Sequence, residues 1–221
     1  MKRTVLITGA SRGIGAAIKS RLGSEGMTVL SPGRAELDLL SNNSIDAYLG
    51  SLKSPVDILV NNAGINYLAA LEEITPETLE TMVQVNLTAP IRLLKGIVPG
   101  MKKNRFGRIV NISSIFGIIS KERRLLYTTT KSALIGMTKT LALELGGYNI
   151  LVNSIAPGYV LTELTRQNNS PEEIERISSA IPLKRMAEPA EIAEVAAFLC
   201  SDKNTYITGQ AIVVDGGFTC M

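Results

Sequence analysis

Short apolar runs rich in β-branched residues alternate along this chain with longer segments of helical periodicity. Strands that alternate with helices join through right-handed crossovers into a mainly parallel sheet. The runs are almost continuously apolar, which is typical of strands buried on both faces. We therefore predict an α/β fold in which helices cover both faces of a doubly wound parallel sheet. The predicted strands are Val5–Thr8, Val29–Ser31, Ile58–Asn61, Ile109–Ser113, Leu151–Ile155 and Ile212–Val214, and the predicted helices are Ile14–Glu25, Ile45–Leu52, Glu77–Met101, Leu125–Leu145 and Ala190–Leu199.

The length of the chain suits a single domain, 1–221. Its 221 residues are 45% hydrophobic and 19% charged, which provides enough apolar material for a large core. The least regular part, 159–183, is polar and contains Asn168, Asn169 and Pro171. We interpret it as a flexible substrate loop or a pair of short helices, because long irregular excursions in compact domains are often functional.

Histidine is absent, and Cys200 and Cys220 are the two cysteines. The absence of histidine excludes Ser-His-Asp and Cys-His hydrolases, and two lone cysteines make neither a disulfide framework nor a zinc site. We therefore predict no metal. A net charge of +3 is too small for a dedicated nucleic-acid binder, and no apolar run is long enough to span a membrane. We expect a cytoplasmic protein with no nucleic-acid or membrane partner.

A glycine-rich turn follows the first predicted strand and opens the first predicted helix. Glycines at such a turn let the backbone approach a pyrophosphate, and the helix N-terminus supplies free N–H groups. The spacing is G-x-x-x-G-x-G, so a tight connection without a ligand is the alternative. The predicted cofactor-binding residues of this turn are Gly9, Ser11, Arg12, Gly13, Ile14 and Gly15.

The end of the second predicted strand bears on the choice between NADP and NAD. An acidic residue there would bind the ribose 2′-hydroxyl of NAD, but the segment Ser31–Arg34 has none. Arg12 and Arg34 are two guanidinium groups that can bind a 2′-phosphate, although they can equally be solvated surface arginines. We predict that NADP(H) is preferred and that NAD(H) is possible.

Several motifs occur together in one order along the chain, namely Thr8-Gly9-x-x-x-Gly13-Ile14-Gly15, Asn61-Asn62-Ala63-Gly64, Asn86, Ser114, Tyr127-x-x-x-Lys131 and Pro157-Gly158. In this order and at these separations they resemble the short-chain dehydrogenase/reductase family, in its small single-domain branch. The resemblance covers essentially the whole chain. It implies a Rossmann-type fold and an NAD(P)-dependent oxidoreductase that transfers a hydride between the nicotinamide and a carbonyl or secondary alcohol.

The resemblance implies four catalytic residues: Asn86, Ser114, Tyr127 and Lys131. In the family the tyrosine gives a proton to the carbonyl oxygen, the serine binds that oxygen, and the asparagine keeps a water in the proton relay. The lysine holds the nicotinamide ribose. Tyr127 and Lys131 are four residues apart and share a helix face, so we expect the ammonium to lower the pKa of Tyr127. Ser113 is the competing serine.

The resemblance also implies further contacts with the cofactor. Asp38 corresponds to an aspartate at the adenine edge, and Asp215 is expected to anchor the C-terminal strand. The Asn-rich turn packs under the adenine, and the segment after the fifth strand touches the nicotinamide and the pyrophosphate. The residues concerned are Asn62, Ala63, Gly64, Tyr127, Lys131, Pro157, Gly158, Val160 and Thr162.

Two segments depart from the family pattern. Between Arg34 and Asp38 there is no room for the usual helix, and we expect the chain to pass from one strand to the next through Ala35–Leu37. The loop Lys121–Arg124 carries three cations before the catalytic tyrosine. These cations are compatible with a phosphate, carboxylate or nucleotide-diphosphate substrate, and equally with a solvated loop at a helix start.

The substrate is a small carbonyl or alcohol compound, with an acidic or carrier-bound form left open. The sequence most resembles 3-oxoacyl-[acyl-carrier-protein] reductases; the alternative is a sugar or polyol dehydrogenase of a surface-polysaccharide or secondary pathway. A non-catalytic dinucleotide sensor is a remote alternative, because it would be expected to lose Tyr127 or Lys131. Met101–Arg105 supplies part of a basic patch for an acidic carrier, but Tyr148 stands where those reductases carry a cation. A homotetramer, or a homodimer, is implied by the family.

Overall fold

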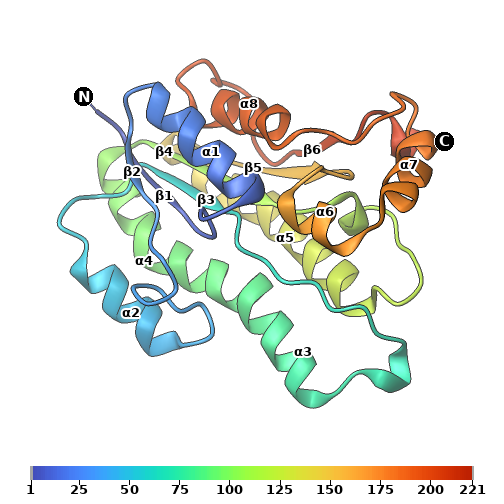
Figure 1. Cartoon of the computed structure of the whole chain (residues 1–221). Helices are drawn as coiled ribbons and strands as arrows, with labels where there is room; N and C mark the ends of the chain where they lie inside the picture. The colour runs from blue at the N-terminus through green and yellow to red at the C-terminus, as the bar shows by residue number, and fades with distance from the viewer. Residues whose placement is uncertain (1, 221) are drawn as a thin grey trace.

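Six parallel strands form one sheet in the computed structural model, which describes residues 2–220. The strand order is β2-β1-β3-β4-β5-β6, so the direction of winding reverses between β1 and β3 (Figure 1). Ligands of doubly wound folds bind at the carboxyl edge of the sheet at such a reversal. The strands are β1 Thr4–Ile7, β2 Thr28–Leu30, β3 Ile58–Asn61, β4 Gly107–Ile112, β5 Ile150–Pro157 and β6 Ala211–Val214.

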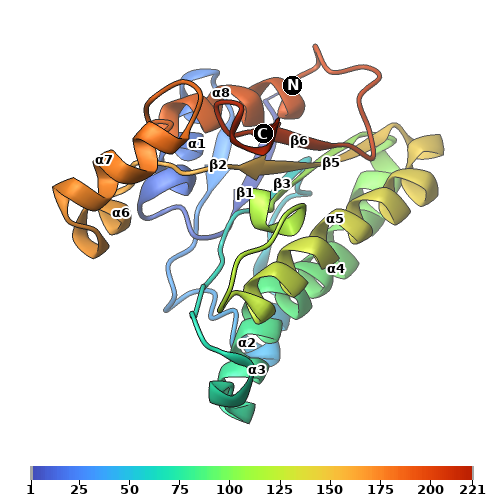
Figure 2. The same cartoon turned by 90° about the vertical axis from the view of Figure 1, so that its right-hand side faces the viewer.

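Helices cover both faces of the sheet, as Figure 2 shows with the sheet between α1 and α8 on one side and α4 and α5 on the other. Each side has its own cluster of buried apolar residues. No helix in the described part of the chain is long and apolar enough to cross a membrane. The helices are α1 Gly13–Ser24, α2 Asn42–Ser51, α3 Pro76–Val83, α4 Ala89–Asn104, α5 Leu125–Leu145, α6 Glu163–Asn168, α7 Pro171–Ala180 and α8 Pro189–Cys200.

The predicted fold class is confirmed, and each predicted strand overlaps an observed one. The predicted helix Glu77–Met101 is wrong as a single α-helix. A π-helical turn, Gln84–Thr88, separates α3 from α4 and carries the buried side chain of Asn86. Turns of this kind inside α-helices are frequent at functional sites.

The segment after β2 contains the turn Gly33–Glu36 and no helix before Asp38, as predicted. The expected passage into a further strand is wrong, because the chain continues from this turn through a loop into α2. The Asp38 amide N–H donates to the Ser44 hydroxyl, and the Asp38 carboxylate accepts from the Leu40 amide. These local bonds use polar groups that a strand would pair with β2, so β2 forms the edge of the sheet.

The segment predicted as a loop or two short helices forms α6 and α7. Thr162 and Ser170 cap these helices, each accepting a hydrogen bond from a backbone amide in the first turn. A β-bridge between Val160 and Ala187 fixes the start of the segment. The cap residue Thr162 also lies against Gly13 at the start of α1, which brings the segment to the carboxyl edge of the sheet.

Candidate active site

Two cavities of about 690 and 490 Å³ lie near the carboxyl ends of the strands, and both are lined by Ile65 and Tyr67. Gly13, Gly15 and Asn86 line neither. The predicted site residues that line the larger cavity are Arg12, Ile14, Asn62, Gly64, Ser114, Tyr127, Lys131, Pro157, Gly158, Val160 and Thr162. Those that line the smaller cavity are Gly9, Ser11, Arg34, Asp38 and Ala63.

The glycine-rich turn is packed tightly against the end of β3. Gly9 has a φ of +65°, and a Cβ atom there would lie 2.9 Å from the Ala63 Cα. A Cβ on Gly15 would lie 2.3 Å from the Gly9 carbonyl oxygen. The side-chain amide of Asn62 donates through Nδ2 to the carbonyls of Thr8 and Gly9, at 2.9 Å each. Only glycine therefore fits at these two positions, and Asn62 holds the turn in place.

The first turn of α1 is arranged to receive an anion. Arg12 precedes the helix without capping it through its side chain, and the first turn contains no acidic residue. The first N–H groups of a helix without such a cap are available to a bound group, and the helix dipole favours a negative charge there. The diphosphate of a nicotinamide dinucleotide fits this position, with the cavities on either side available to its two nucleosides.

The smaller cavity contains two cations and one carboxylate. The Arg34 side chain is exposed and lies 3.6 Å from the Asp38 carboxylate, and Lys19 of α1 lines the same cavity. Arg12 lines the larger cavity, and its joint contact with Arg34 on one phosphate stays a prediction. Sequence reasoning missed Lys19, although its position one helical turn after Gly15 would place it beside the turn.

Lys131 is buried beneath the larger cavity. The residue is 4% exposed, and its Nζ donates to the Ile112 carbonyl oxygen at 2.8 Å. The same Nζ lies 5.6 Å from the centre of the Tyr127 ring. A Cβ on Gly64 would come within 3.2 Å of this Nζ, so the glycine leaves the space that the ammonium occupies.

Burial determines the pKa values of this pair. It raises the pKa of Tyr127, and the Ser114 hydroxyl and the Arg124 guanidinium oppose this with smaller effects. Burial also lowers the pKa of Lys131 to about 8. The predicted lowering of the Tyr127 pKa by Lys131 is therefore not found, and the ammonium donates to Ile112 instead.

Two adjacent serines at the end of β4 have different partners. The Ser113 hydroxyl donates to the Lys131 carbonyl at 2.8 Å, which fixes it to α5. Ser114 begins a 3-10 turn, where its Oγ accepts from the Phe116 amide, and its hydroxyl interacts with Tyr127. Ser114 thus lies beside Tyr127 in the larger cavity, and its binding of the substrate oxygen stays a prediction.

Asn86 lies behind the cavities and is 1% exposed. Its Oδ1 accepts from the Ile65 amide and its Nδ2 donates to the Ile65 carbonyl, both at 2.9 Å. The same Nδ2 donates to the Thr130 hydroxyl on α5. These bonds make Asn86 a positioning residue for the segment that lines both cavities.

The turn after β5 is held by Asp215. A Cβ on Gly158 would lie 2.8 Å from the Asp215 Cα, so the two segments are in close contact. Partial burial alone would raise the pKa of Asp215, but hydrogen bonds from Thr219 and from the Gly217 amide lower it. The carboxylate therefore anchors the chain after β6, as expected.

Several residues that line the larger cavity were not predicted. They lie within four residues after recognised motifs in the sequence, and this proximity is the signal that could have identified them. Phe116, Tyr159 and Phe218 form an edge-to-face row, with ring centres 6.2 and 5.5 Å apart. The unpredicted lining residues that bear on a substrate are Asn66, Leu68, Phe116 and Tyr159, and Arg124 of the cationic loop Lys121–Arg124 lines the cavity with them.

Comparison with known proteins identifies the class. A family model described as Enoyl-(Acyl carrier protein) reductase matches residues 33–219. A 3-oxoacyl-[acyl-carrier-protein] reductase of Aquifex aeolicus is 39% identical over 96% of this chain and 95% of its own length. The fold, the site and these matches define an NAD(P)-dependent oxidoreductase. The chain belongs to the short-chain dehydrogenase/reductase family.

Two solved structures agree with this assignment. The structure of a 4-hydroxyisoleucine dehydrogenase complexed with NADH is 30% identical, covers all of both chains and has a TM-score of 0.94. A putative NAD(P)-dependent gluconate 5-dehydrogenase from Beutenbergia cavernae with bound NADP is 31% identical, with a TM-score of 0.89. It covers 99% of this chain and 97% of its own.

The buried ammonium of Lys131 generates a prediction about stability. Its pKa in the folded protein is about 8, below the ordinary value of 10.5. Between about pH 8 and pH 10.5 the unfolded chain therefore binds more protons than the folded chain. The wild-type protein becomes more stable as pH rises through this range. We expect the stability of Lys131→Met relative to wild type to fall by about 2 to 3 kcal/mol between about pH 7 and about pH 10 in urea unfolding. Lys139→Met, which removes an exposed ammonium from α5, controls for lost charge; parallel pH curves for wild type and Lys131→Met would contradict the prediction.

Proposed function

We propose that this enzyme uses NADPH to reduce the carbonyl of a 3-oxoacyl thioester bound to an acyl carrier protein. The observation that carries the proposal is the meeting of Ser114, Tyr127 and Lys131 in one cavity beside the glycine-rich turn. The similarity of this protein to a 3-oxoacyl-[acyl-carrier-protein] reductase over nearly the whole chain supports the substrate class.

In this mechanism the protein's residues orient the substrate and move one proton. When bound, the reduced nicotinamide supplies the hydride. The Ser114 hydroxyl donates a hydrogen bond to the carbonyl oxygen and holds it beside the Tyr127 hydroxyl. Tyr127 stays protonated because burial raises its pKa, and it gives its proton to the oxygen as negative charge develops there. The Ser114 hydroxyl and the Arg124 guanidinium favour the resulting phenolate, and the ammonium of Lys131 binds the nicotinamide ribose.

A basic patch on α4 supports docking of an acidic carrier. Lys102 lies over the ring of Tyr148, with its Nζ 4.8 Å from the ring centre, and Arg105 donates to the Gly147 carbonyl. Lys102, Arg105 and Tyr148 thus belong to one surface, and its cations come from the end of α4. A sugar or polyol acid is the second candidate substrate, favoured by the likeness to the putative gluconate 5-dehydrogenase structure.

The rest of the proposal concerns the whole chain and its assembly. We propose that the chain acts as one domain in the cytoplasm and that 159–183 covers the substrate. We also propose a homotetramer, with a homodimer as the alternative, which buries exposed apolar side chains such as Ile91 on α4 and Leu143 on α5. Light scattering at micromolar concentration should give four times the monomer mass of 23.7 kDa, and a stable monomer would contradict this.

The two cations of the smaller cavity predict the preference between cofactors. Arg34 and Lys19 are placed to bind the 2′-phosphate that only NADPH carries. Replacement of either residue by alanine should raise the KM for NADPH by roughly tenfold or more and leave the KM for NADH nearly unchanged. Steady-state kinetics with both cofactors measure this, with NADH as the internal control, and equal effects on the two would show that neither residue meets the phosphate.

The proton-donor role of Tyr127 predicts the effect of its replacement. Tyr127→Phe removes the transferred proton and little else, so we expect unchanged NADPH affinity and a loss of turnover of roughly a hundredfold or more. NADPH oxidation with an acetoacetyl carrier-protein thioester measures turnover, and quenching of protein fluorescence measures binding. Near-full activity of Tyr127→Phe would overturn the mechanism, and a wild type inactive with every acyl thioester would overturn the substrate class.

A further inference from the structure

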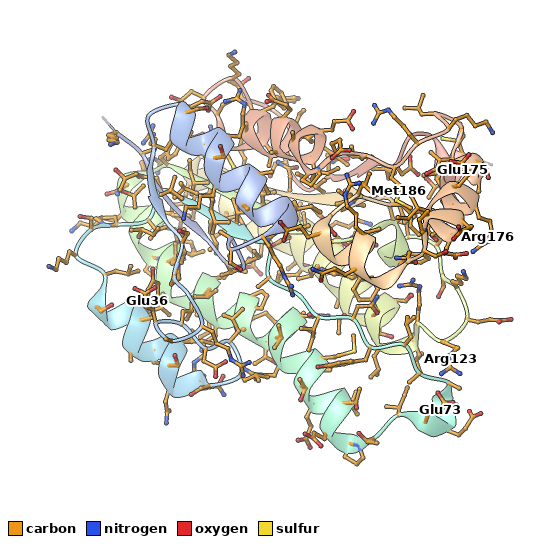
Figure 3. The ribbon with its side chains drawn as sticks, in the orientation of Figure 1. Glu36, Glu73, Arg123, Glu175, Arg176 and Met186 are labelled. Atoms are coloured by element: carbon orange, nitrogen blue, oxygen red, sulfur yellow. The ribbon has the colours of Figure 1, made fainter. Side chains whose placement is uncertain are left out.

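The loop Lys121–Arg124 places neighbouring arginines in different surroundings. Arg123 has a φ of +63° and pairs with Glu73, at 2.6 Å, on the outer surface of the molecule, as Figure 3 shows. Arg124 lines the larger cavity together with Tyr127. The left-handed backbone at Arg123 therefore separates a surface ion pair from a cation that faces the active site.

Arg124 is held in position by both its backbone and its side chain. Its neighbour Arg123 accepts a hydrogen bond from the Ala69 amide at 3.0 Å, and Ala69 forms a β-bridge with Arg124 itself. The Arg124 guanidinium carbon lies 4.2 Å from the centre of the Phe116 ring and 6.0 Å from that of Tyr127. A guanidinium stacked on a buried ring keeps its N–H groups in the ring plane free to donate sideways.

The charge around Arg124 is positive. Within residues 2–220, no carboxylate lies within ion-pair distance of its guanidinium. A third cavity, of about 430 Å³, adjoins the larger cavity at Arg124 and is also lined by Lys121 and Arg176. The single carboxylate of that lining, Glu173, is paired with Arg176 at 2.6 Å. Arg124 thus stands at the junction of the two cavities without an ion-pair partner among the described residues, and Lys121 adds a further cation to the adjoining cavity.

We propose that Arg124 is a specificity-determining residue that binds an anionic group on the substrate, a carboxylate or a phosphate, a few bonds from the reacting carbonyl. The inference rests on the proposed carbonyl reduction at Tyr127. Within that reaction it favours an acidic substrate such as the sugar or polyol acid over a 3-oxoacyl thioester, which carries no anionic group near its reacting carbonyl. A guanidinium binds either anion through two parallel hydrogen bonds, which also fixes the orientation of the attached carbonyl. The short separation between Arg124 and Tyr127 requires the anion to be close to that carbonyl.

Pairs of substrates that differ only in charge test this inference. Acetoacetate and its ethyl ester differ in a carboxylate, and dihydroxyacetone phosphate and dihydroxyacetone differ in a phosphate. We expect wild-type enzyme with NADPH to show a kcat/KM roughly 10- to 100-fold higher for the charged member of at least one pair. The pair that shows the preference identifies the anion.

Variants of the loop assign the preference to one residue. Arg124→Gln should abolish the preference by lowering kcat/KM for the charged member, and Arg124→Lys should restore part of it. Arg124 also affects the pKa of Tyr127, so its loss changes both members of a pair, and the ratio between them is the informative quantity. Arg123→Gln, which breaks only the surface pair with Glu73, is the matched control and should keep the wild-type ratio.

The inference is overturned if wild type shows no preference for either charged probe, or if Arg124→Gln leaves the ratio unchanged. Reduction of the neutral thioester S-acetoacetyl-N-acetylcysteamine with no charge preference would retain the proposed function and reject this inference. If no probe is reduced, the proposed function fails, and the melting temperature of enzyme saturated with NADP⁺ decides the inference. Acetoacetate or inorganic phosphate should then raise the melting temperature of wild type and Arg123→Gln but not that of Arg124→Gln. Equal shifts in all three proteins would overturn the inference.

Discussion

The attachment of α5 to the end of β4 is the interaction on which the site depends. The Ser113 hydroxyl donates to the Lys131 carbonyl, and the Lys131 ammonium donates to the Ile112 carbonyl, each at 2.8 Å. Gly117 lies at the same contact, where a Cβ would come within 2.9 Å of the Lys131 backbone. These contacts leave α5 little freedom to slide or rotate. They therefore fix Tyr127, one helical turn before Lys131, relative to the serine that follows Ser113.

This attachment is maintained although it carries an energetic cost. Burial of the Lys131 ammonium lowers its pKa to about 8, and one carbonyl bond only partly offsets the lost hydration. Further along the same interface, Asn111 accepts from the Asn61 amide and donates to the Thr138 hydroxyl. Hydrogen bonds through Asn111 join β3, β4 and α5 across the interior and specify one alignment of these elements, which apolar packing alone would specify less strictly.

The sheet, the glycine-rich turn and the Tyr127–Lys131 pair could be predicted because each depends on local spacing or periodicity. Other features depend on distant parts of the chain that meet only in the fold. Nothing local to Tyr127 indicates that burial raises its pKa while Ser114 and Arg124 oppose this. Nothing local to Asp38 indicates that a serine on α2 takes the amide that a strand would use. Likewise, the sequence does not distinguish the adjacent Arg123 and Arg124. In the fold, the left-handed backbone of Arg123 directs its side chain to Glu73, whereas Arg124 stacks on Phe116.

The absence of a strand beyond β2 gives the smaller cavity a different kind of wall. Thr81 of α3 and Val85 of the π-helical turn line it, so the same helical region forms part of that cavity and carries Asn86. Asn86 holds Ile65, which lines both cavities, by bonds to its amide and its carbonyl. A change in the π-helical turn would therefore shift the walls of both cavities together. The packing of α3 and α4 therefore bears on both cavities.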